Sequence, residues 1–341
     1  MRARRHIRNT LFAVTAVALL CPAAVRAQSK TGTTIGQFLL IEPSARISAM
    51  GNAGVALYDG IQSIYYNPAA AGQLTRYELQ VTHSEWLAGI NYDYVALGVP
   101  IESVGNFFLS VTSLHSGDID VRTVGQPLGT GERFTVENLA LGVGYGRQFT
   151  PRFGAGIQAN YVEETVWHTS LRTWTIGAGT AYRFPGGLRL GSSISHFGTR
   201  AGFGGRDLRI QYDADPDVFG DNSALPAEQF ADDFAVPILF RVGVTMPREL
   251  SPNSMLLVSV DAFHPNDNKE SVSFGTEWTW NNTLALRAGY QDLFLEDSEV
   301  GLTLGVGIGG RIDLSVFDFD YVWADHGRLD ATHRFTFALG F

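Results

Sequence analysis

The sequence predicts an all-β fold: a transmembrane antiparallel β-barrel of about 14 strands with an N-terminal hatch segment in the lumen. Three observations lead to this prediction. Apolar residues alternate with small or polar residues in segments of about ten residues. The chain ends on an aromatic-rich segment of the same kind. A region without this alternation precedes the first such segment.

The first 27 residues have the three parts of an export signal. Four arginines and no acid stand among the first nine residues, an apolar run follows over Leu11–Leu20, and Val25-Arg26-Ala27 offers small residues to a signal peptidase. The run is about half of the roughly 20 residues that a membrane helix needs. Cys21 follows Leu20, where a lipoprotein signal requires a small residue. We therefore predict a signal peptide over 1–27, no lipidation and export to the outer membrane of a Gram-negative cell.

Composition excludes several classes of function. The 341 residues include 25 Lys and Arg against 34 Asp and Glu, and the leader holds five of the arginines and none of the acids. Such an acidic chain lacks the clustered bases that bind nucleic acid. Beyond the leader there is no cysteine, so disulfides and cysteine metal sites are excluded. With 45% hydrophobic and only 17% charged residues, the chain fits a large soluble β fold or a barrel facing lipid.

Period-two alternation identifies the strands. From Val300 to Ile308, for example, every second residue is Val, Leu or Ile, and the residues between are Gly or Thr. The same reading predicts strands over 77–83, 90–99, 104–114, 134–149, 153–168, 171–184, 188–197, 236–246, 254–264, 270–281, 283–292, 299–309, 311–323 and 332–341. The number is even, as bacterial single-chain barrels require. A short alternating piece over 118–124 is predicted to be a loop or a strand extension.

Three features favour a membrane barrel over a soluble sandwich. The strands are long compared with the usual five or six residues. The last strand carries Phe335, Phe337, Leu339 and Phe341 in alternation, which resembles the signal read by outer-membrane assembly machinery. Aromatic residues stand near strand ends, as in an interfacial girdle. They are Tyr77, Tyr92, Tyr94, Phe149, Trp167, Trp174, Phe184, Trp280, Tyr290 and Trp323.

The connections between strands differ in length. Pro151-Arg152 and Asn281-Asn282 have the chemistry of tight hairpin turns. One connection, 198–235, is long and acidic, and barrels of this membrane have short periplasmic turns and longer outer loops. We therefore place the acidic loop outside the cell. Its acids include Asp213, Asp215, Asp217 and Asp221.

The segment before the barrel, 28–76, is predicted to be an N-terminal extension and lumen hatch, followed by the barrel over 77–341. Its motifs are Phe38-Leu39-x-Ile41-x-Pro43-Ser44-Ala45-Arg46, Met50-Gly51-x-Ala53-Gly54-Val55-Ala56 and Tyr65-Tyr66-Asn67-Pro68-Ala69-Ala70. Here the sequence resembles the PorV/PorQ family, within the FadL-like superfamily of long-chain fatty-acid transporter barrels. The resemblance is dense over 36–72 and implies a fourteen-stranded barrel with a hatch. The hatch positions are Arg46, Gly51, Gly54, Asp59, Asn67 and Pro68.

A barrel of this size leaves a lumen that its own side chains cannot fill, so a plug is expected. Inward-facing positions are mostly Gly, Ser and Thr, which leave room for a packed peptide. Arg46 and Asp59 could pair with inward charges, although charges solvated in a wet lumen are the simpler reading. The predicted lumen charges are Glu78, Arg183, Arg241, Asp261, Glu277 and Arg287, with Arg189 and Arg334 of the same set.

Metal and catalytic sites are not predicted. Asp213-x-Asp215-x-Asp217 resembles the start of an EF-hand loop, but Val218 and Ala224 stand where Gly and Glu are required. Histidine 196 follows Ser195, yet neighbours on a strand point to opposite faces and cannot form a dyad. We expect no enzymatic activity, no cofactor and a solvated acidic loop.

Three functions remain open. The PorV/PorQ resemblance implies an accessory of protein secretion or surface display, which would bind exported proteins or secretion machinery at its outer loops. The FadL-like superfamily implies passive transport of fatty acids or other hydrophobic small molecules. A structural barrel is the third. Because the inward set is mostly small or charged, with exceptions such as Leu239, Leu257 and Phe263, the sequence favours the secretion accessory. Outer-membrane lipid is a partner in every case.

Overall fold

The computed structural model describes residues 32–215, 217–218, 224–296 and 298–341. The predicted signal peptide, 1–27, lies outside the described residues, as does Asp221 of the acidic loop. Among the described helices, none has the length and apolar character needed to span a membrane.

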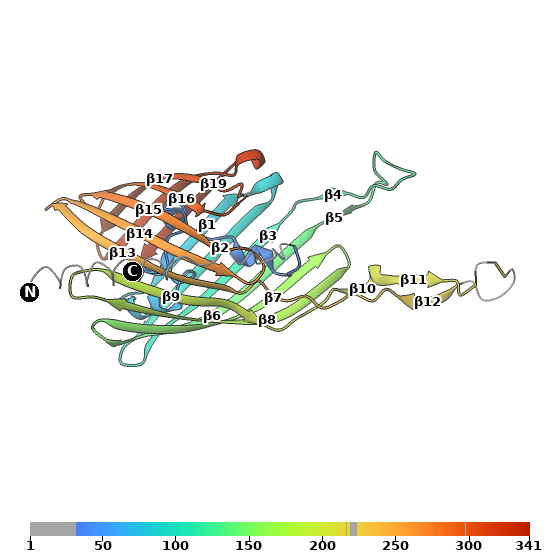
Figure 1. Cartoon of the computed structure of the whole chain (residues 1–341), viewed down its shortest axis with the longest axis horizontal. Helices are drawn as coiled ribbons and strands as arrows, with labels where there is room; N and C mark the ends of the chain where they lie inside the picture. Colours follow the sequence, from blue (N-terminus) through green and yellow to red (C-terminus); the bar gives the residue numbers. More distant parts are fainter. Residues whose placement is uncertain (1–31, 216, 219–223, 297) are drawn as a thin grey trace, which may run out of the picture. The chain divides into compact units, whose positions relative to one another are not determined.

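Within the described residues, fourteen strands form a closed antiparallel barrel (Figure 1). Consecutive strands of the barrel pair with each other, and β1 also pairs with β19, which closes the ring. All fourteen predicted strands are thereby confirmed, with ends shifted by a few residues. The strands are β1 Glu78–Glu85, β2 Asn91–Ile101, β3 Gly105–His115, β6 Val136–Thr150, β7 Phe153–Val166, β8 Thr169–Arg183, β9 Arg189–Gly198, β13 Leu239–Ser251, β14 Ser254–Pro265, β15 Ser271–Trp280, β16 Leu284–Leu293, β17 Leu302–Ile312, β18 Ser315–Asp325 and β19 Ala331–Gly340.

The apolar face of the strands points outward. On β17, Leu302, Leu304 and Ile308 are exposed, whereas Thr303 between them is 1% exposed and faces the interior. Where the last strand, β19, meets the first, β1, Phe341 stacks on Tyr77 with ring centroids 5.9 Å apart. An outer surface of this kind is stable against lipid rather than water. Two girdle assignments are wrong: Tyr92 and Tyr94 are buried inside the barrel because Asn91, Asp93 and Val95 take the outward positions of β2.

The two ends of the barrel differ. At the short-turn end, where β1 begins and β19 ends, two residues suffice to join β6 to β7, β13 to β14 and β17 to β18. At the long-loop end, 116–135 and 199–238 contain secondary structure that the sequence did not predict. β4 (Ile119–Asp120) pairs with β5 (Arg133–Phe134), and β11 (Arg209–Tyr212) pairs with β12 (Leu225–Glu228). β10 (Gly204–Gly205) and η5 (Arg206–Leu208) precede this second hairpin, and η4 (Leu87–Gly89) and η6 (Gly327–Leu329) lie at the same end.

The N-terminal segment, residues 35–74, is almost wholly buried against the inward faces of the strands (Figure 1, blue). It contains η1 Gln37–Leu40, α2 Ala45–Ser48, η2 Ile61–Ser63 and η3 Pro68–Gln73. Side-chain caps set the helix starts: the Ile47 N–H donates to Ser44 Oγ, and the Ala69 N–H donates to Asn67 Oδ1. Pro68 opens η3, where its missing N–H is not needed.

Small inward residues let this segment approach the barrel backbone. Gly51 has φ +62°, and a Cβ there would lie 2.7 Å from the carbonyl oxygen of Tyr290. Gly305 faces Ala49, and Gly275 and Gly289 face Met50. The glycines that make the strands alternate are therefore also the positions where α2 and the residues after it pack.

Candidate functional site

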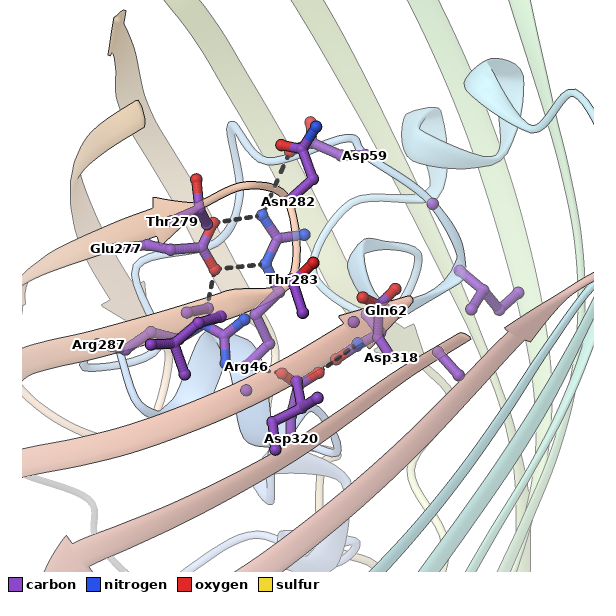
Figure 2. Close-up of a pocket in the computed structure, with 18 of the residues that line it drawn as sticks. Arg46, Asp59, Gln62, Glu277, Thr279, Asn282, Thr283, Arg287, Asp318 and Asp320 are labelled. Atoms are coloured by element: carbon purple, nitrogen blue, oxygen red, sulfur yellow. Dashed lines mark hydrogen bonds and ion pairs between the residues drawn. The ribbon is translucent and has the colours of Figure 1, made fainter. Parts of the chain in front are cut away.

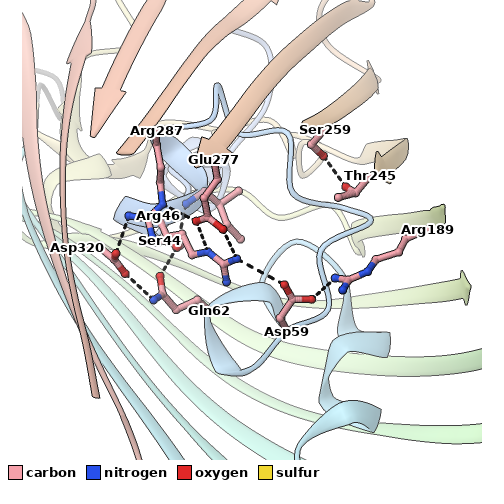
Figure 3. A network of polar contacts seen from close by, with 11 residues as sticks. Ser44, Arg46, Asp59, Gln62, Arg189, Thr245, Ser259, Glu277, Arg287 and Asp320 are labelled. Carbon is pink, nitrogen blue, oxygen red and sulfur yellow. Dashed lines mark hydrogen bonds and ion pairs between the residues drawn. The ribbon is translucent and has the colours of Figure 1, made fainter. Parts of the chain in front are cut away.

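A network of charged side chains ties the N-terminal segment to the barrel wall (Figure 3). Arg46 Nε and Nη2 each lie 2.8 Å from an oxygen of Glu277 on β15. Arg287 Nε lies 2.6 Å from Glu277, and its Nη1 lies 2.7 Å from Asp320. We call Arg46, Glu277, Arg287 and Asp320 the charged network.

The network is buried, which makes each partner necessary. Glu277, Arg287 and Asp320 have side chains 4%, 5% and 2% exposed. Burial acts against the charge of Arg46, but Glu277 and Asp59 outweigh it and raise the pKa of Arg46 well above its usual range. In such surroundings the loss of one partner leaves the others uncompensated. The alternative that these lumen charges are solvated is therefore wrong, because the N-terminal segment excludes water from them.

Asp59 extends these contacts to β9, three strands away from β15 along the barrel wall. It accepts from Arg189 on β9 and lies 3.5 Å from Arg46 Nη2 (Figure 3). Near it, the guanidinium groups of Arg183 and Arg189 lie 5.8 and 5.3 Å from the ring centroid of Tyr58. Arg183 itself is exposed. The N-terminal segment is thus held by ion pairs to β9 as well as to β15.

A polar cavity of about 230 Å³ lies beside the charged network toward the short-turn end (Figure 2). Glu78 lines it and accepts from the Ile61 N–H at 2.7 Å, and Asp318 and Thr279 also face it. Because dehydrating these groups is costly, an apolar solute gains nothing by entering this cavity. This cavity is therefore an unfavourable environment for a hydrophobic compound.

Two further predicted lumen charges, Arg241 and Asp261, are fully buried at the middle of the barrel. Asp261 accepts from the Val55 N–H at 2.7 Å. Arg241 lies 3.7 Å from Glu42 and within 5.8 Å of the ring centroids of Tyr65 and Tyr66. Within the described residues its guanidinium nitrogens make no hydrogen bond. Burial raises the pKa of Glu42, although Arg241 and Arg334 act in the opposite direction.

The remaining hatch positions are structural. Asn67 donates from Nδ2 to the carbonyl oxygens of Val55 and Thr180, both at 2.9 Å. Pro68 lies against Gly156 and Gly179, and Gly54 against Ile47. These contacts join η3 to β7 and β8.

The wall of the barrel is interrupted between β8 and β9. Ile176 pairs with Phe197 and Ala178 pairs with Ile194, so Gly177 faces two residues, Ser195 and His196. His196 has φ +60°, the geometry of a β-bulge. Contrary to the prediction of opposite faces, Ser195 and His196 are both buried, since the extra residue turns His196 inward.

An inner and an outer hollow meet at this interruption. The inner one, which we call the tyrosine cavity, has a volume of about 20 Å³ and is lined by Tyr65, Tyr92 and Tyr94 together with His196. The outer one is an apolar groove of about 530 Å³. Gly177 and Gln158 line both. The groove is bordered by Phe107, Val143, Ile157, Ile176, Ile194 and Phe197.

A cavity of about 500 Å³, which we call the mouth cavity, lies at the long-loop end. Phe38, Ile41 and Glu42 of the N-terminal segment line one side, and Trp86 and Arg334 line another. Leu39 of the same η1 turn faces the tyrosine cavity, so η1 divides the two. Neither cavity could be predicted from the sequence, because their walls come from segments that are distant along the chain.

In the described part of the acidic loop, the acidic side chains do not converge on a site. Asp213 and Asp215 accept from the backbone N–H groups two residues further on, and Asp215 and Asp217 are exposed beyond β11. Among the described residues, no three His, Cys, Asp or Glu side chains come together in a way that could hold a metal ion.

Comparison with known proteins places the fold. No family model and no curated protein matches the sequence. The toluene transporter TodX of Pseudomonas putida superposes with a TM-score of 0.54 at 14% identity, covering 87% of this chain and 96% of TodX. This chain has the fold of an outer-membrane hydrocarbon transporter. The toluene transporter TbuX of Ralstonia pickettii gives 0.52 at 14% identity over 88% and 98%, and the monoaromatic hydrocarbon channel CymD gives 0.52 at 14% over 89% and 98%. The narrower PorV/PorQ assignment stays a prediction.

Proposed function

We propose that this barrel lies in the cell outer membrane and transports small hydrophobic compounds passively. The observation that carries the proposal is the pair Gly177 and Gln158, which line both the tyrosine cavity and the apolar groove. A compound would reach lipid by this route only after the side chains around the tyrosine cavity, whose volume is about 20 Å³, moved aside at the bulge. The export signal, the apolar outer surface and the fold shared with hydrocarbon channels support the location.

A sideways exit agrees with the polarity of the lumen. The charged network and polar cavity occupy the β15–β18 side and the short-turn end, where a hydrophobic solute would have to dehydrate carboxylates and guanidinium groups. Taken together as one set, the inward-facing residues of the strands are mostly small or charged and count against a hydrophobic route. The structure divides them into a polar side and a thin wall rich in glycine.

The test is toluene uptake by cells that lack the gene and carry a plasmid copy. Gly177→Leu fills the interruption, because a Cβ there already lies 3.1 Å from the carbonyl oxygen of Ile194. We expect uptake to fall to the level of the deletion strain. Gly186→Leu is the matched control, since no atom lies within 4 Å of its Cβ position. Unchanged uptake in a correctly assembled Gly177→Leu barrel rules out this exit.

A second candidate is the secretion accessory implied by the PorV/PorQ resemblance. The observation in its favour is the β11–β12 hairpin, a separate two-stranded sheet with exposed Tyr212 and Leu225 and unpaired outer edges. Unpaired edges can add a strand from another chain. A deletion strain with normal toluene uptake and impaired release of surface proteins would favour this function over transport.

A further inference from the structure

The mouth cavity contains a buried positive charge that forms no ion pair of its own among the described residues. Arg334 on β19 is 5% exposed and lines the cavity. It donates from Nη1 to Ser48 Oγ, and its Nε has no hydrogen-bond partner within the described residues. None of the ion pairs in the described chain includes Arg334. A guanidinium removed from water in this way is costly unless an anion joins it.

The carboxylates that line the same cavity are already engaged. Glu42 faces Arg241 at 3.7 Å, Glu164 accepts from the Gly36 N–H, and Glu299 accepts from Arg328 Nε at 2.6 Å. Glu42 is close enough to Arg334 to interact with it as well as with Arg241, so two guanidinium groups share one carboxylate and one positive charge remains in excess. The field of Arg334 also reaches His326: burial first, and then Arg334, lower the pKa of that imidazole, so His326 is neutral at pH 7.

The wall around Arg334 is aromatic and apolar. The guanidinium carbon lies 5.7 Å from the ring centroid of Trp86, and the His326 ring meets the same indole edge-on at 5.3 Å. Phe38, Ile41 and Leu114 extend the apolar lining. Flat rings are well accommodated by such walls, which offer both faces and edges for contact.

From these observations we infer that the mouth cavity binds an aromatic carboxylate, with the carboxylate at Arg334 and the ring against Trp86 and Phe38. A guanidinium pairs with a carboxylate through parallel N–H donors, and Arg334 Nε is such a donor without a partner. The inference rests on the proposed transport function, in which this cavity is the first binding site. It distinguishes this chain's substrates from toluene by one negative charge.

The test uses benzoate and toluene, which share a ring and differ in the charged group. Benzoate binding to the purified, detergent-solubilised barrel is measured by titration calorimetry for the wild type, Arg334→Met and Arg334→Lys. We expect Arg334→Met to weaken benzoate binding about tenfold or more, the effect of one charge-assisted hydrogen bond. Arg334→Lys keeps the charge and should weaken binding less. Benzyl alcohol, a neutral probe, should not distinguish the three proteins.

Toluene uptake by cells carrying the wild-type barrel separates this inference from the proposed function. If transport is correct, these cells take up toluene and the deletion strain does not. Toluene uptake without benzoate binding, or equal benzoate binding by wild type and a folded Arg334→Met, overturns the inference and leaves the transport function standing. Benzoate binding that depends on Arg334, without any toluene uptake, overturns the transport function and leaves the aromatic-carboxylate site standing. Stronger binding of benzylammonium than of benzoate also overturns the inference.

Discussion

At the scale of single residues, the charged network shows how a polar lumen can hold a buried segment. Arg46 and Glu277 meet through two hydrogen bonds of 2.8 Å across 231 positions of the sequence. Arg287 shares the same carboxylate and passes the contact on to Asp320. Each charge is acceptable only because the others are present. The network is thus cooperative, and its central member is Glu277.

Glu277→Gln tests this dependence. The substitution removes one negative charge between two guanidinium groups without changing the side-chain volume much, so it should lower the free energy of unfolding by about 3–5 kcal/mol. Urea unfolding in detergent micelles, followed by tryptophan fluorescence, measures the change. Glu296→Gln is the control, because the Lys269–Glu296 pair has side chains 40% and 80% exposed and should contribute less than about 1 kcal/mol. Equal effects of the two variants would contradict a buried network.

At the scale of elements, the N-terminal segment and the strands fit each other through small residues. Gly51 must be glycine for two reasons: its φ of +62° and the closeness of the Tyr290 carbonyl oxygen. The residues that follow α2 can therefore follow the wall of β15 and β16 closely. Gly275 and Gly289 on the inward faces of these strands allow this packing, whereas Phe274 and Tyr290 point outward.

Gly51→Ala should loosen this contact. The left-handed conformation alone disfavours alanine by about 1–2 kcal/mol, and the clash with Tyr290 adds to it. Limited proteolysis of the folded barrel should cut the N-terminal segment faster in Gly51→Ala than in wild type. Gly186→Ala, in an open turn with no atom within 4 Å of the added Cβ, should leave the cleavage rate unchanged. Slow cleavage in both variants would mean that the segment is not held at Gly51.

The elements also show what a sequence can predict. Strands such as β17 follow from alternation, because one face meets lipid and the other meets small residues. The inward direction of the charged side chains follows from the same alternation. The partners of those charges do not, because the pairing of Arg46 with Glu277 depends on where a non-alternating segment lies. The bulge at His196 was hidden as well, since Ser195-His196 carries no glycine to signal a left-handed residue. Tyr92 and Tyr94 were misplaced because they stand near a strand end, where girdle and lumen positions look alike.

At the scale of the whole molecule, charge is distributed unevenly. The long-loop end carries exposed acids such as Asp215, Asp217 and Glu228, whereas the charge in excess at the mouth cavity is the positive Arg334. An anion approaching the mouth is repelled by the exposed acids and attracted only after it has entered. A neutral ring feels neither effect. The molecule therefore has exposed acids at its long-loop end and a cationic site in its interior.

This arrangement predicts an unusual salt dependence for benzoate. Raising the ionic strength from about 0.01 M to 0.15 M shortens the Debye length from about 30 Å to about 8 Å. Salt screens the repulsion between benzoate and the exposed acids of the long-loop end, but it screens the buried contact with Arg334 much less. Benzoate should therefore bind more tightly and associate faster as salt is added. A simple ion pair at an exposed site would instead weaken as salt is added.

Stopped-flow fluorescence of Trp86 quenching, compared with Trp86→Phe, measures the association rate. Replacing Asp213, Asp215 and Asp217 together by Asn should raise the low-salt rate toward the high-salt value. A benzoate affinity that falls with salt in the wild type would place the anion at the surface and not in the mouth cavity.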